Sequence, residues 1–426
     1  NVPNEQIIDL DFTVKKNIYN LADFKNKKPE NLTACILDRP RHKEIIDELI
    51  KMKVNLKNKR IFICATEQSG DNIGAGIIEQ LLKYNTNITV DGVGGSKMSP
   101  YLSNQYFSTN DFKSIGILEI FFSIIKYINM ISFLSKKIIK NNYDLVITID
   151  SPDFNYPLIK KVRKNRFNHN IIQIVAPTVW AWREDRARKF SKIFDEILVL
   201  FEFEKKYFMK YGLKTTFIGH PIYYLKDLPS SKIKKDVIAF LPGSRLGEVK
   251  SLFKYFQISY EYLLKVKPNI TIFIPTLPHL KNIISSNTAN WQIKTIISTD
   301  ENLNNQYYSF ANYALVCSGT ASLEISKRLI PQLVIYKLNY ITEIIMRNFV
   351  KIPFANIINI IEREMVIPEL TNSKLNKMIF VQKFDDLINN NLANDKQIYN
   401  VKHALKKIES SDSPYFIATK RIINYL

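Results

Sequence analysis

The sequence contains little cysteine. Among its 426 residues are three cysteines, Cys35, Cys64 and Cys317, which lie far apart and show no metal-binding spacing. An odd number at such distances excludes a disulfide scaffold and a zinc ribbon, and it fits a reducing compartment. The first residues form no charged-then-apolar leader, so we expect no signal peptide and a cytoplasmic protein.

A long apolar run is also missing. No stretch of about 18 residues is apolar and free of charge, so we expect no transmembrane helix. The nearest stretch is 115–139, which Glu119, Lys126, Lys136 and Lys137 interrupt. Its pattern predicts one or two helices that are apolar over more than half of their circumference. Such a helix packs against a sheet or lies in a membrane interface with its lysines towards lipid phosphates, and both interpretations stay open.

Acidic residues are too few to balance the basic ones. The chain has 60 Lys and Arg against 40 Asp and Glu, which gives a net charge of +20. This excess favours an anionic partner, namely a nucleic acid, an acidic membrane or a phosphorylated substrate. The abundance of Lys, Asn and Ile is typical of AT-rich coding, which explains part of the excess. Neither an RNA-binding aromatic motif nor a zinc finger is present, so we expect no nucleic-acid partner.

Short apolar strands alternate with helical patterns along most of the chain. Residues 1–58 are polar and helical with one strand-like stretch, and the alternation begins at residue 59. A segment with proline and serine, 228–232, divides the alternating region into two domains, 59–228 and 229–426. Strands are predicted at 60–65, 88–93, 145–149, 171–175, 197–201 and 216–219, and then at 237–241, 270–274, 313–317 and 332–336.

The predicted strands are continuously apolar. Such strands, separated by helices, are typical of a parallel sheet that is covered on both faces. The sequence therefore predicts an α/β fold with two Rossmann-like, doubly wound αβα domains and a small N-terminal appendage. Ligands of these sheets bind at the carboxyl ends of the strands, and we expect the two domains to face each other across a ligand-binding cleft.

A polar segment, Thr66–Asp71, follows the first strand. Gly70 permits a tight turn, and the N-terminus of the next helix offers free N–H groups to an anion or a hydroxyl. Glu67 could accept a proton or bind sugar hydroxyls. The alternative is an ordinary helix cap formed by Ser69 or Asp71.

A second polar segment, Ile149–Asn155, follows another strand of the same domain. Pro152 fixes the turn, and two aspartates with an asparagine are more polar than packing alone requires. Asp150 is a candidate general base near a substrate hydroxyl. The alternative is that Asp153 or Asn155 caps the next helix.

A third segment, Ala176–Arg183, concentrates aromatic and basic residues. It holds Trp180 and Trp182, two of the chain's three tryptophans, beside Arg183, and two further arginines follow. These residues either line the ligand pocket or belong to a helix whose aromatics pack in an interdomain core.

The second domain opens with a Gly-Ser-Arg turn inside Leu241–Val249. Backbone N–H groups and Ser244 could hold one phosphate of a diphosphate, while Arg245 binds the remaining oxygens. The spacing matches neither the Walker motif nor GxGxxG, so ATPase and dehydrogenase functions lose support.

A similar turn, Cys317–Glu324, follows a later strand of this domain. The N-terminus of its helix could bind phosphate through Ser318, Gly319 and Thr320. Glu324 follows in the helix and could accept ribose hydroxyls. Two such turns in one domain support each other, so we expect the second domain to hold a nucleotide and the first domain to hold the acceptor.

Taken in order, these motifs resemble those of lipid-A-disaccharide synthases, bacterial glycosyltransferases with the GT-B arrangement of two Rossmann-like domains. Within residues 59–426 the matching strings are Glu67–Asp71, Ile149–Asn155, Ala176–Arg183, Ile218–Pro221, Leu241–Arg245, Ser318–Glu324, Asn359 and Pro368-Glu369. The departures are small, since Thr66, Gln68 and Ala176 stand where the family favours Gly, Ala and Ser.

The resemblance implies a reaction and its partners. A diacylated glucosamine is transferred from UDP to the 6-hydroxyl of a diacylglucosamine 1-phosphate, UDP is released, and the new β-1,6 linkage implies inversion. An anionic inner-membrane surface is implied as a further partner, with the protein peripheral on its cytoplasmic face. No cofactor and no metal ion are implied.

The resemblance also implies roles for individual residues. Asp150 becomes the expected base, with Glu67 as the alternative. The residues expected to bind UDP and its diphosphate are Ser244, Arg245, Ser318, Gly319, Thr320, Glu324 and Asn359. The residues expected to line the acceptor and donor pockets are Ser69, Asp71, Asp153, Asn155, Trp182 and Arg183.

The N-terminal segment 1–58 resembles another family. The strings Ile7–Asp11, Lys16–Ala22 and Leu32–His42 are similar to an internal stretch of class II fructose-1,6-bisphosphatase. That family's metal-binding carboxylates and its later Asp-Gly-Asp loop are missing here, so we expect an inactive fragment.

Two rival functions stay open. One is another UDP-sugar enzyme of the GT-B type, such as an N-acetylglucosaminyltransferase of peptidoglycan synthesis or a UDP-sugar epimerase. The other is a non-enzymatic membrane-binding module, which would leave the two phosphate turns unexplained.

Overall fold

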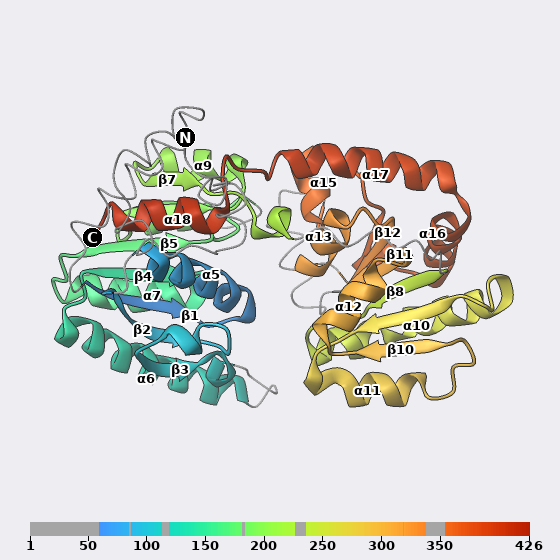
Figure 1. Cartoon of the computed structure of the whole chain (residues 1–426), viewed down its shortest axis with the longest axis horizontal. Helices are drawn as coiled ribbons and strands as arrows, with labels where there is room; N and C mark the ends of the chain where they lie inside the picture. The colour runs from blue at the N-terminus through green and yellow to red at the C-terminus, as the bar shows by residue number, and fades with distance from the viewer. Residues whose placement is uncertain are drawn as a thin grey trace, which may run out of the picture. The chain divides into compact units, whose positions relative to one another are not determined.

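The structure is a computed structural model. It describes residues 59–84, 87–112, 119–180, 184–225, 236–317, 319–337 and 354–426. The predicted N-terminal appendage and three predicted site residues, Trp182, Arg183 and Ser318, lie outside these ranges. The chain forms two compact units, which are coloured by residue number in Figure 1 and described separately below.

The first unit is built on a parallel sheet with the strand order β3-β2-β1-β4-β5-β6-β7. Its strands are β1 Arg60–Ala65, β2 Thr89–Gly94, β3 Asn104–Ser108, β4 Leu145–Ile149, β5 Asn170–Ile174, β6 Glu196–Val199 and β7 Lys214–Phe217. Its helices are α5 Gln68–Tyr84, α6 Glu119–Asn141, α7 Pro152–Lys164, α8 Asp185–Phe190, α9 Lys205–Met209 and α18 Pro414–Ile423, with short 3-10 turns η2 Ser99–Tyr101, η3 Thr109–Phe112 and η4 Glu202–Glu204. Two separate clusters of buried apolar side chains cover the two faces of the sheet, which explains why the central strands are continuously apolar.

The second unit repeats this plan with the strand order β10-β9-β8-β11-β12-β13, again parallel throughout. Its strands are β8 Val237–Leu241, β9 Thr271–Pro275, β10 Thr295–Ser298, β11 Ala311–Cys317, β12 Gln332–Tyr336 and β13 Glu369–Thr371. Its helices are α10 Leu246–Val266, α11 Pro278–Thr288, α12 Glu301–Tyr308, α13 Thr320–Lys327, α15 Ile357–Glu362, α16 Lys377–Asn389 and α17 Asn391–Lys406, with 3-10 turns η5 Pro221–Tyr224 and η6 Asn372–Lys374. The predicted α/β fold with two doubly wound parallel sheets is confirmed.

The sequence did not reveal three strands, β3, β10 and β13. Each of them lies at an edge of its sheet. Edge strands are often short and polar, because one side of an edge strand has no neighbour. β3 and β13 follow this rule, since they read Asn-Gln-Tyr-Phe-Ser and Glu-Leu-Thr.

The second domain was expected to span 229–426, whereas the structure assigns Ser410–Leu426 to the first unit. α18, drawn at the red end of the colour scale in Figure 1, lies beside α5 of that unit. Its Ile422 joins the buried cluster that contains Ile61 and Ile77. Gly76 permits the close approach, because a Cβ there would lie 2.6 Å from the ring of Tyr415. The apolar face of α18 therefore decides the boundary.

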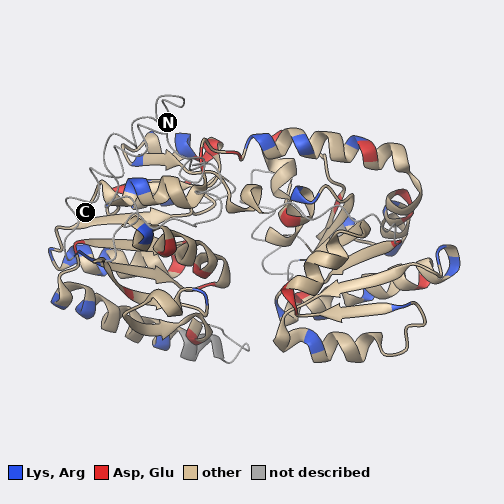
Figure 2. Ribbon diagram, viewed as in Figure 1, with Lys and Arg blue, Asp and Glu red and all other residues tan. Residues whose placement is uncertain are grey.

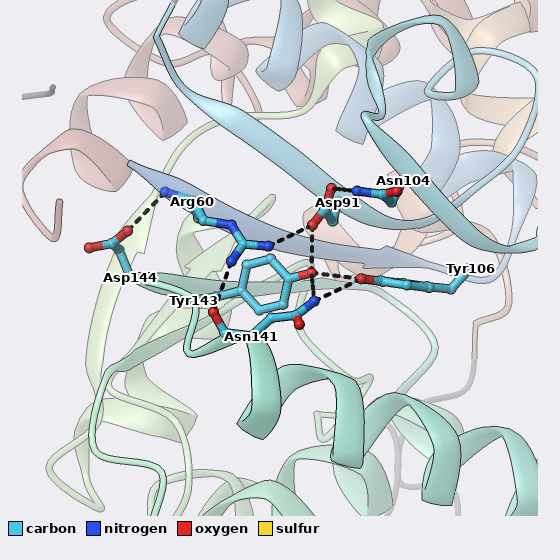
Figure 3. Close-up of polar contacts among 7 residues, drawn as sticks. All are labelled: Arg60, Asp91, Asn104, Tyr106, Asn141, Tyr143 and Asp144. Carbon is cyan, nitrogen blue, oxygen red and sulfur yellow. Dashed lines mark hydrogen bonds and ion pairs between the residues drawn. The ribbon is translucent and has the colours of Figure 1, made fainter. Parts of the chain in front are cut away.

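A buried polar network lies where strands of the first sheet begin (Figure 3). Asp91 is completely buried and accepts hydrogen bonds from the hydroxyl of Tyr143 at 2.7 Å and the amide of Asn104 at 2.9 Å. Arg60 lies 3.3 Å from the same carboxylate and stacks on the Tyr143 ring. The network also includes Tyr106, Asn141 and Asp144. Ligands of such sheets bind at the opposite, carboxyl ends of the strands, so we assign this network to stability.

The apolar stretch 115–139 forms α6 from Glu119 onward. No helix in the described part of the chain is long and apolar enough to cross a membrane. One face of α6 packs in the core through Met130, Leu134 and Ile138. The other exposes Ile124, Ile125, Ile128 and Phe133. Of the two interpretations left open by the sequence, packing against the sheet therefore describes one face of this helix.

Candidate active site

The carboxyl ends of three neighbouring strands bring the predicted residues of the first unit together. In the register of β1, β4 and β5, Ala65 pairs with Ile149, and Ile149 pairs with Ile174. The residues that follow each strand therefore meet at one edge of the sheet. Ser69 at the start of α5 lies there with its hydroxyl 3.4 Å from Oδ2 of Asp150.

The backbone at this edge is strained. Asp150, Ser151 and Val175 have φ angles of 53°, 45° and 67°, in the left-handed region that non-glycine residues rarely adopt. For the β-branched Val175 this conformation is a clear outlier. Such strain persists only where surrounding contacts hold it, and it concentrates at functional sites.

The carboxylate of Asp150 is suited to accept a proton. Burial raises its pKa, and the backbone N–H of Ser151 and the hydroxyl of Ser69 oppose this shift by donating to the charged form. A carboxylate with a raised pKa is a stronger base than an exposed one.

Two predicted pocket residues of this unit are buried and hydrogen-bonded within the protein. Asp71 is completely buried, and its carboxylate accepts N–H groups of the loop after β2, at 2.6 Å from Gly95 and 3.0 Å from Met98. Asn155 is also completely buried, and its amide donates to the carbonyl oxygens of Ile149 at 3.2 Å and Asp150 at 2.8 Å. Both side chains therefore support the edge of the sheet from within.

Glu67 and Asp153 are exposed. Asp153 forms a 2.5 Å ion pair with Arg186, and its side chain is 83% exposed. Glu67 lies close enough to α6 for its charge, together with burial, to raise the pKa of Tyr127. Both carboxylates therefore reach solvent near the candidate base.

The Gly-Ser-Arg turn of the second unit already holds an anionic group. Gly243 has a φ of 110°, and a Cβ there would lie 2.7 Å from the carboxylate of Glu248. That carboxylate accepts the N–H groups of Ser244 at 3.1 Å and Arg245 at 3.2 Å. The side chain of Arg245 is 73% exposed. The donors predicted for a phosphate are thus occupied by a helix cap, whereas the guanidinium is accessible.

The second predicted phosphate turn lies at a neighbouring strand end. Register pairs Val316 of β11 with Leu241 of β8, so the two turns follow adjacent strands. Gly319, with a φ of 137°, precedes Thr320, the first residue of α13. Glu324 accepts from Arg328 at 2.8 Å and is partly exposed.

Asn359 serves as an internal support. It is completely buried, and its amide group donates to the carbonyl and accepts from the N–H of Ile367, both at 2.8 Å. Glu369 is buried nearby and accepts the N–H of Asn356 at 2.7 Å. Burial raises the pKa of Glu369, and backbone donors oppose the shift.

Sequence reasoning missed Glu248 and Gln173. The signal for Glu248 was its place three residues after Arg245, where a glutamate completes a capping box. The signal for Gln173 was a polar residue inside the apolar strand β5. Among the described residues no group of three His, Cys, Asp or Glu side chains could hold a metal ion.

The Gly-His-Pro segment gives a pH prediction. Burial lowers the pKa of His220 to about 4, and its Nδ1 accepts the N–H of Ile222 at 3.1 Å. Between pH ~6.5 and ~4 this histidine is protonated in the unfolded state but neutral in the folded state. The free energy of unfolding therefore decreases as the pH is lowered through this window, by up to about 3 kcal/mol. His220→Asn keeps an acceptor at this cap and should flatten the dependence in urea titrations at pH 7, 6, 5 and 4. An unchanged pH slope in this variant contradicts the assignment.

Comparison with known proteins identifies the family. The model of the family described as lipid-A-disaccharide synthetase matches residues 61–419. A Rickettsia prowazekii (strain Madrid E) protein described as lipid-A-disaccharide synthase is 35% identical over 377 residues, which cover 85% of this chain and 98% of the relative. The chain belongs to the lipid-A-disaccharide synthase family. The predicted function, a glycosyltransferase of lipid A synthesis, is thereby confirmed.

Solved structures agree on the fold of this lipid-A-disaccharide synthase family member. A UDP co-structure of S. aureus MnaA is 12% identical with a TM-score of 0.57, and covers 86% of this chain and 95% of that one. The structure of Acinetobacter baumannii MurG is 12% identical with a TM-score of 0.54, and the match covers 86% of this chain and 100% of that one. These likenesses show the GT-B fold alone, and the family match decides against the two rival functions.

A second family model covers the N-terminal segment. The model described as bacterial fructose-1,6-bisphosphatase, glpX-encoded, matches residues 2–61. This short match agrees with the resemblance seen in the sequence, and it ends where the lipid-A-disaccharide synthase match begins.

Proposed function

We propose that the protein transfers a 2,3-diacylglucosamine group from UDP to the 6-hydroxyl of 2,3-diacylglucosamine 1-phosphate, with inversion. Beyond the family match, the main support for this proposal is the environment of Asp150. Its carboxylate has a raised pKa, and it lies on strained backbone at the carboxyl edge of the first sheet. Asp150 accepts the proton of the acceptor's 6-hydroxyl while the oxygen of that hydroxyl forms a bond to C1 of the donor sugar. The bond from C1 to the diphosphate oxygen breaks, and UDP leaves with the electron pair.

Arg245 and the start of α13 are proposed to neutralise the diphosphate. Since Glu248 occupies the backbone donors of its turn, the charge of the exposed Arg245 guanidinium is the main contribution there. The N-terminus of α13, with Gly319 and Thr320, adds N–H groups and a favourable helix dipole. Glu324, which is partly exposed, is proposed to bind the ribose hydroxyls.

The other predicted residues divide into contacts and supports. Ser69 and Asp153 remain proposed substrate contacts, with Glu67 as the alternative base. Asp71, Asn155 and Asn359 are proposed to shape the pockets from inside, because they are buried and bonded within the chain. Trp182, Arg183 and Ser318 remain proposals from the sequence.

The test is a UDP-release assay with UDP-2,3-diacylglucosamine and 2,3-diacylglucosamine 1-phosphate. We expect turnover that requires both substrates, and a product whose new linkage is β by NMR. UDP-N-acetylglucosamine serves as the control donor. Equal turnover with this donor, or conversion of a donor without any acceptor, would overturn the proposal in favour of another UDP-sugar enzyme.

We also propose that α6 binds an anionic membrane surface, such as the cytoplasmic face of the inner membrane. Ile124 and Ile128 are 53% and 58% exposed on this helix. By sequence α6 also carries Lys126, Lys136, Lys137 and Lys140. Figure 2 shows basic residues along this helix. A helix that carries both exposed apolar side chains and lysines fits the boundary between acyl chains and anionic headgroups.

Serine at both Ile124 and Ile128 should weaken binding to phosphatidylglycerol vesicles at least about tenfold, because two apolar anchors are lost. Sedimentation with vesicles measures this change. The matched control is Met378→Ser on α16, where the side chain is 79% exposed but belongs to the other unit. Equal sedimentation of both variants and the unaltered protein argues against membrane binding through α6.

We propose that residues 1–58 take no part in the reaction, because the family match begins at residue 61. A chain that starts at Lys59 should keep kcat within about twofold of the full chain, and the full chain itself should hydrolyse no fructose 1,6-bisphosphate. A large loss of kcat in this deletion, with folding intact by circular dichroism, indicates a role for the segment.

A further inference from the structure

A buried glutamine interrupts strand β5 next to Asp150. The strand reads Asn-Ile-Ile-Gln-Ile, and Gln173 is completely buried in it. A buried carboxamide is costly unless its donors and acceptor are bonded, so apolar residues are the usual choice in a strand covered on both faces. The partners of Gln173 therefore show what the side chain does.

The side-chain NH2 group of Gln173 points to the edge that carries Asp150. Its Nε2 lies 3.2 Å from the carbonyl oxygen of Asp150, and 3.0 Å from the carbonyl oxygens of both Ile174 and Val175. Its Oε1 accepts a 2.6 Å hydrogen bond from the hydroxyl of Thr148. Because this hydroxyl donates to the amide oxygen, it directs the NH2 group towards the three carbonyls.

Two of these carbonyls belong to the strained residues. Asp150 and Val175 have φ angles of 53° and 67°. The carbonyl of Ile174 also accepts the N–H of Asp150 at 2.8 Å, so the same amide group ties both strand ends together. Nothing in the local sequence favours a left-handed Val175, so the Gln173 bonds, together with the bond from the Val175 N–H to the Leu198 carbonyl, oppose relaxation of this backbone.

A second buried carboxamide acts on the same carbonyl. Nδ2 of Asn155 donates to the carbonyl oxygen of Asp150 at 2.8 Å, which uses the second lone pair of that oxygen. Oδ1 of Asn155 has no hydrogen-bond partner in the part of the chain that the structure describes. A core optimised for stability alone avoids a buried acceptor without a partner. Holding Asp150 is therefore a better explanation of this pair than packing.

We propose that Gln173 is a positioning residue for Asp150, whose carbonyl it holds so that the carboxylate stays at the carboxyl edge of the sheet. This inference rests on the proposed function, in which Asp150 is the base. Gln173 does not contact substrate, and its effect on the reaction passes through the backbone of Asp150.

The test compares Gln173→Met, which keeps the size of the side chain but removes its donors, with Tyr143→Phe. Tyr143 donates a buried hydrogen bond to Asp91 in the same unit, in the network assigned to stability. Both variants should lower the melting temperature. Only Gln173→Met should lower kcat, at least about tenfold, with both KM values within about threefold, because displacement of a catalytic group acts on kcat. Gln173→Leu, which also removes the donors and resembles the apolar neighbours in β5, replaces Gln173→Met if that variant does not fold.

The decisive measurement repeats the substitution in an Asp150→Asn background. If Gln173 acts through Asp150, it should change kcat there by less than about twofold, because the group that it positions is already lost. A tenfold loss in both backgrounds, or a normal kcat of the single variant, overturns the inference. If Asp150→Asn alone is nearly as active as the unaltered enzyme, the assignment of Asp150 as the base fails instead, so the two failures are distinguishable.

Discussion

Asparagine in place of Asp150 should lower kcat at least about a hundredfold, because an amide cannot accept the proton of the attacking hydroxyl. The substitution keeps the size of the side chain and the hydrogen bond from Ser69. The loss should therefore appear in kcat, whereas UDP affinity by calorimetry should be unchanged. The measurement is steady-state UDP release with both lipid substrates.

Asp144→Asn is the matched control. Asp144 immediately precedes β4, whereas Asp150 immediately follows it, and the Asp144 carboxylate accepts a hydrogen bond from Lys59 at 3.1 Å. Its loss should reduce stability and leave kcat within about threefold. Nearly normal turnover of Asp150→Asn would transfer the role of base to Glu67.

The pH profile provides an independent check on the same residue. Since burial raises the pKa of Asp150, the base is lost by protonation at a higher pH than an exposed aspartate would require. The acid limb of kcat/KM should accordingly fall above the usual aspartate range, with activity declining as pH decreases. An acid limb that persists unchanged in Asp150→Asn belongs to another group.

The second large effect is expected in the anchor of α18. Glu196 of β6 is completely buried, and its carboxylate forms two hydrogen bonds with Arg421, at 2.9 and 3.0 Å. Arg421→Ala leaves that charge with the hydroxyls of Thr216 and Tyr425 and with the more distant Lys214, at 3.7 Å. Removing one partner of a buried ion pair lowers the free energy of unfolding by about 3 kcal/mol or more. Chemical denaturation of the full chain, followed through the unfolding of the first unit, measures this loss.

Two further variants show whether the buried charge is the cause. Lys214→Ala removes a side chain that is 55% exposed, and should cost less than about 1 kcal/mol. Glu196→Met combined with Arg421→Met removes both charges, and should recover most of the loss from Arg421→Ala. If the double variant is as unstable as Arg421→Ala, the penalty comes from lost packing.

The sequence predicted the centre of each sheet better than its edges. Strands such as β4 and β8 are apolar at every position because helices cover both faces, and this pattern is visible without coordinates. The edge strands β3, β10 and β13 are short or partly polar, so their local pattern does not distinguish them from loops.

The candidate site shows a corresponding limit. The position of Asp150 at the carboxyl edge of the sheet was predictable, because a polar turn directly follows an apolar strand. Asp71 lies in a similar turn, but its carboxylate is used by the N–H groups of Gly95 and its neighbours, 24 residues further along the chain. A local motif does not reveal such a distant partner. The partner of Glu248 is local, but it was overlooked because the same N–H groups, those of Ser244 and Arg245, can bind either a capping glutamate or a phosphate.

The return of α18 to the first unit has a consequence for biosynthesis. α18 follows the whole second unit in the chain, yet its Ile422 packs with Ile61 of the first strand. While the ribosome translates the second unit, the nascent first unit therefore exposes apolar surface that α18 will later cover. Domains generally fold as units during synthesis, and uncovered apolar surface promotes aggregation. We therefore expect the emerging polypeptide to be most prone to aggregation before translation has passed α18.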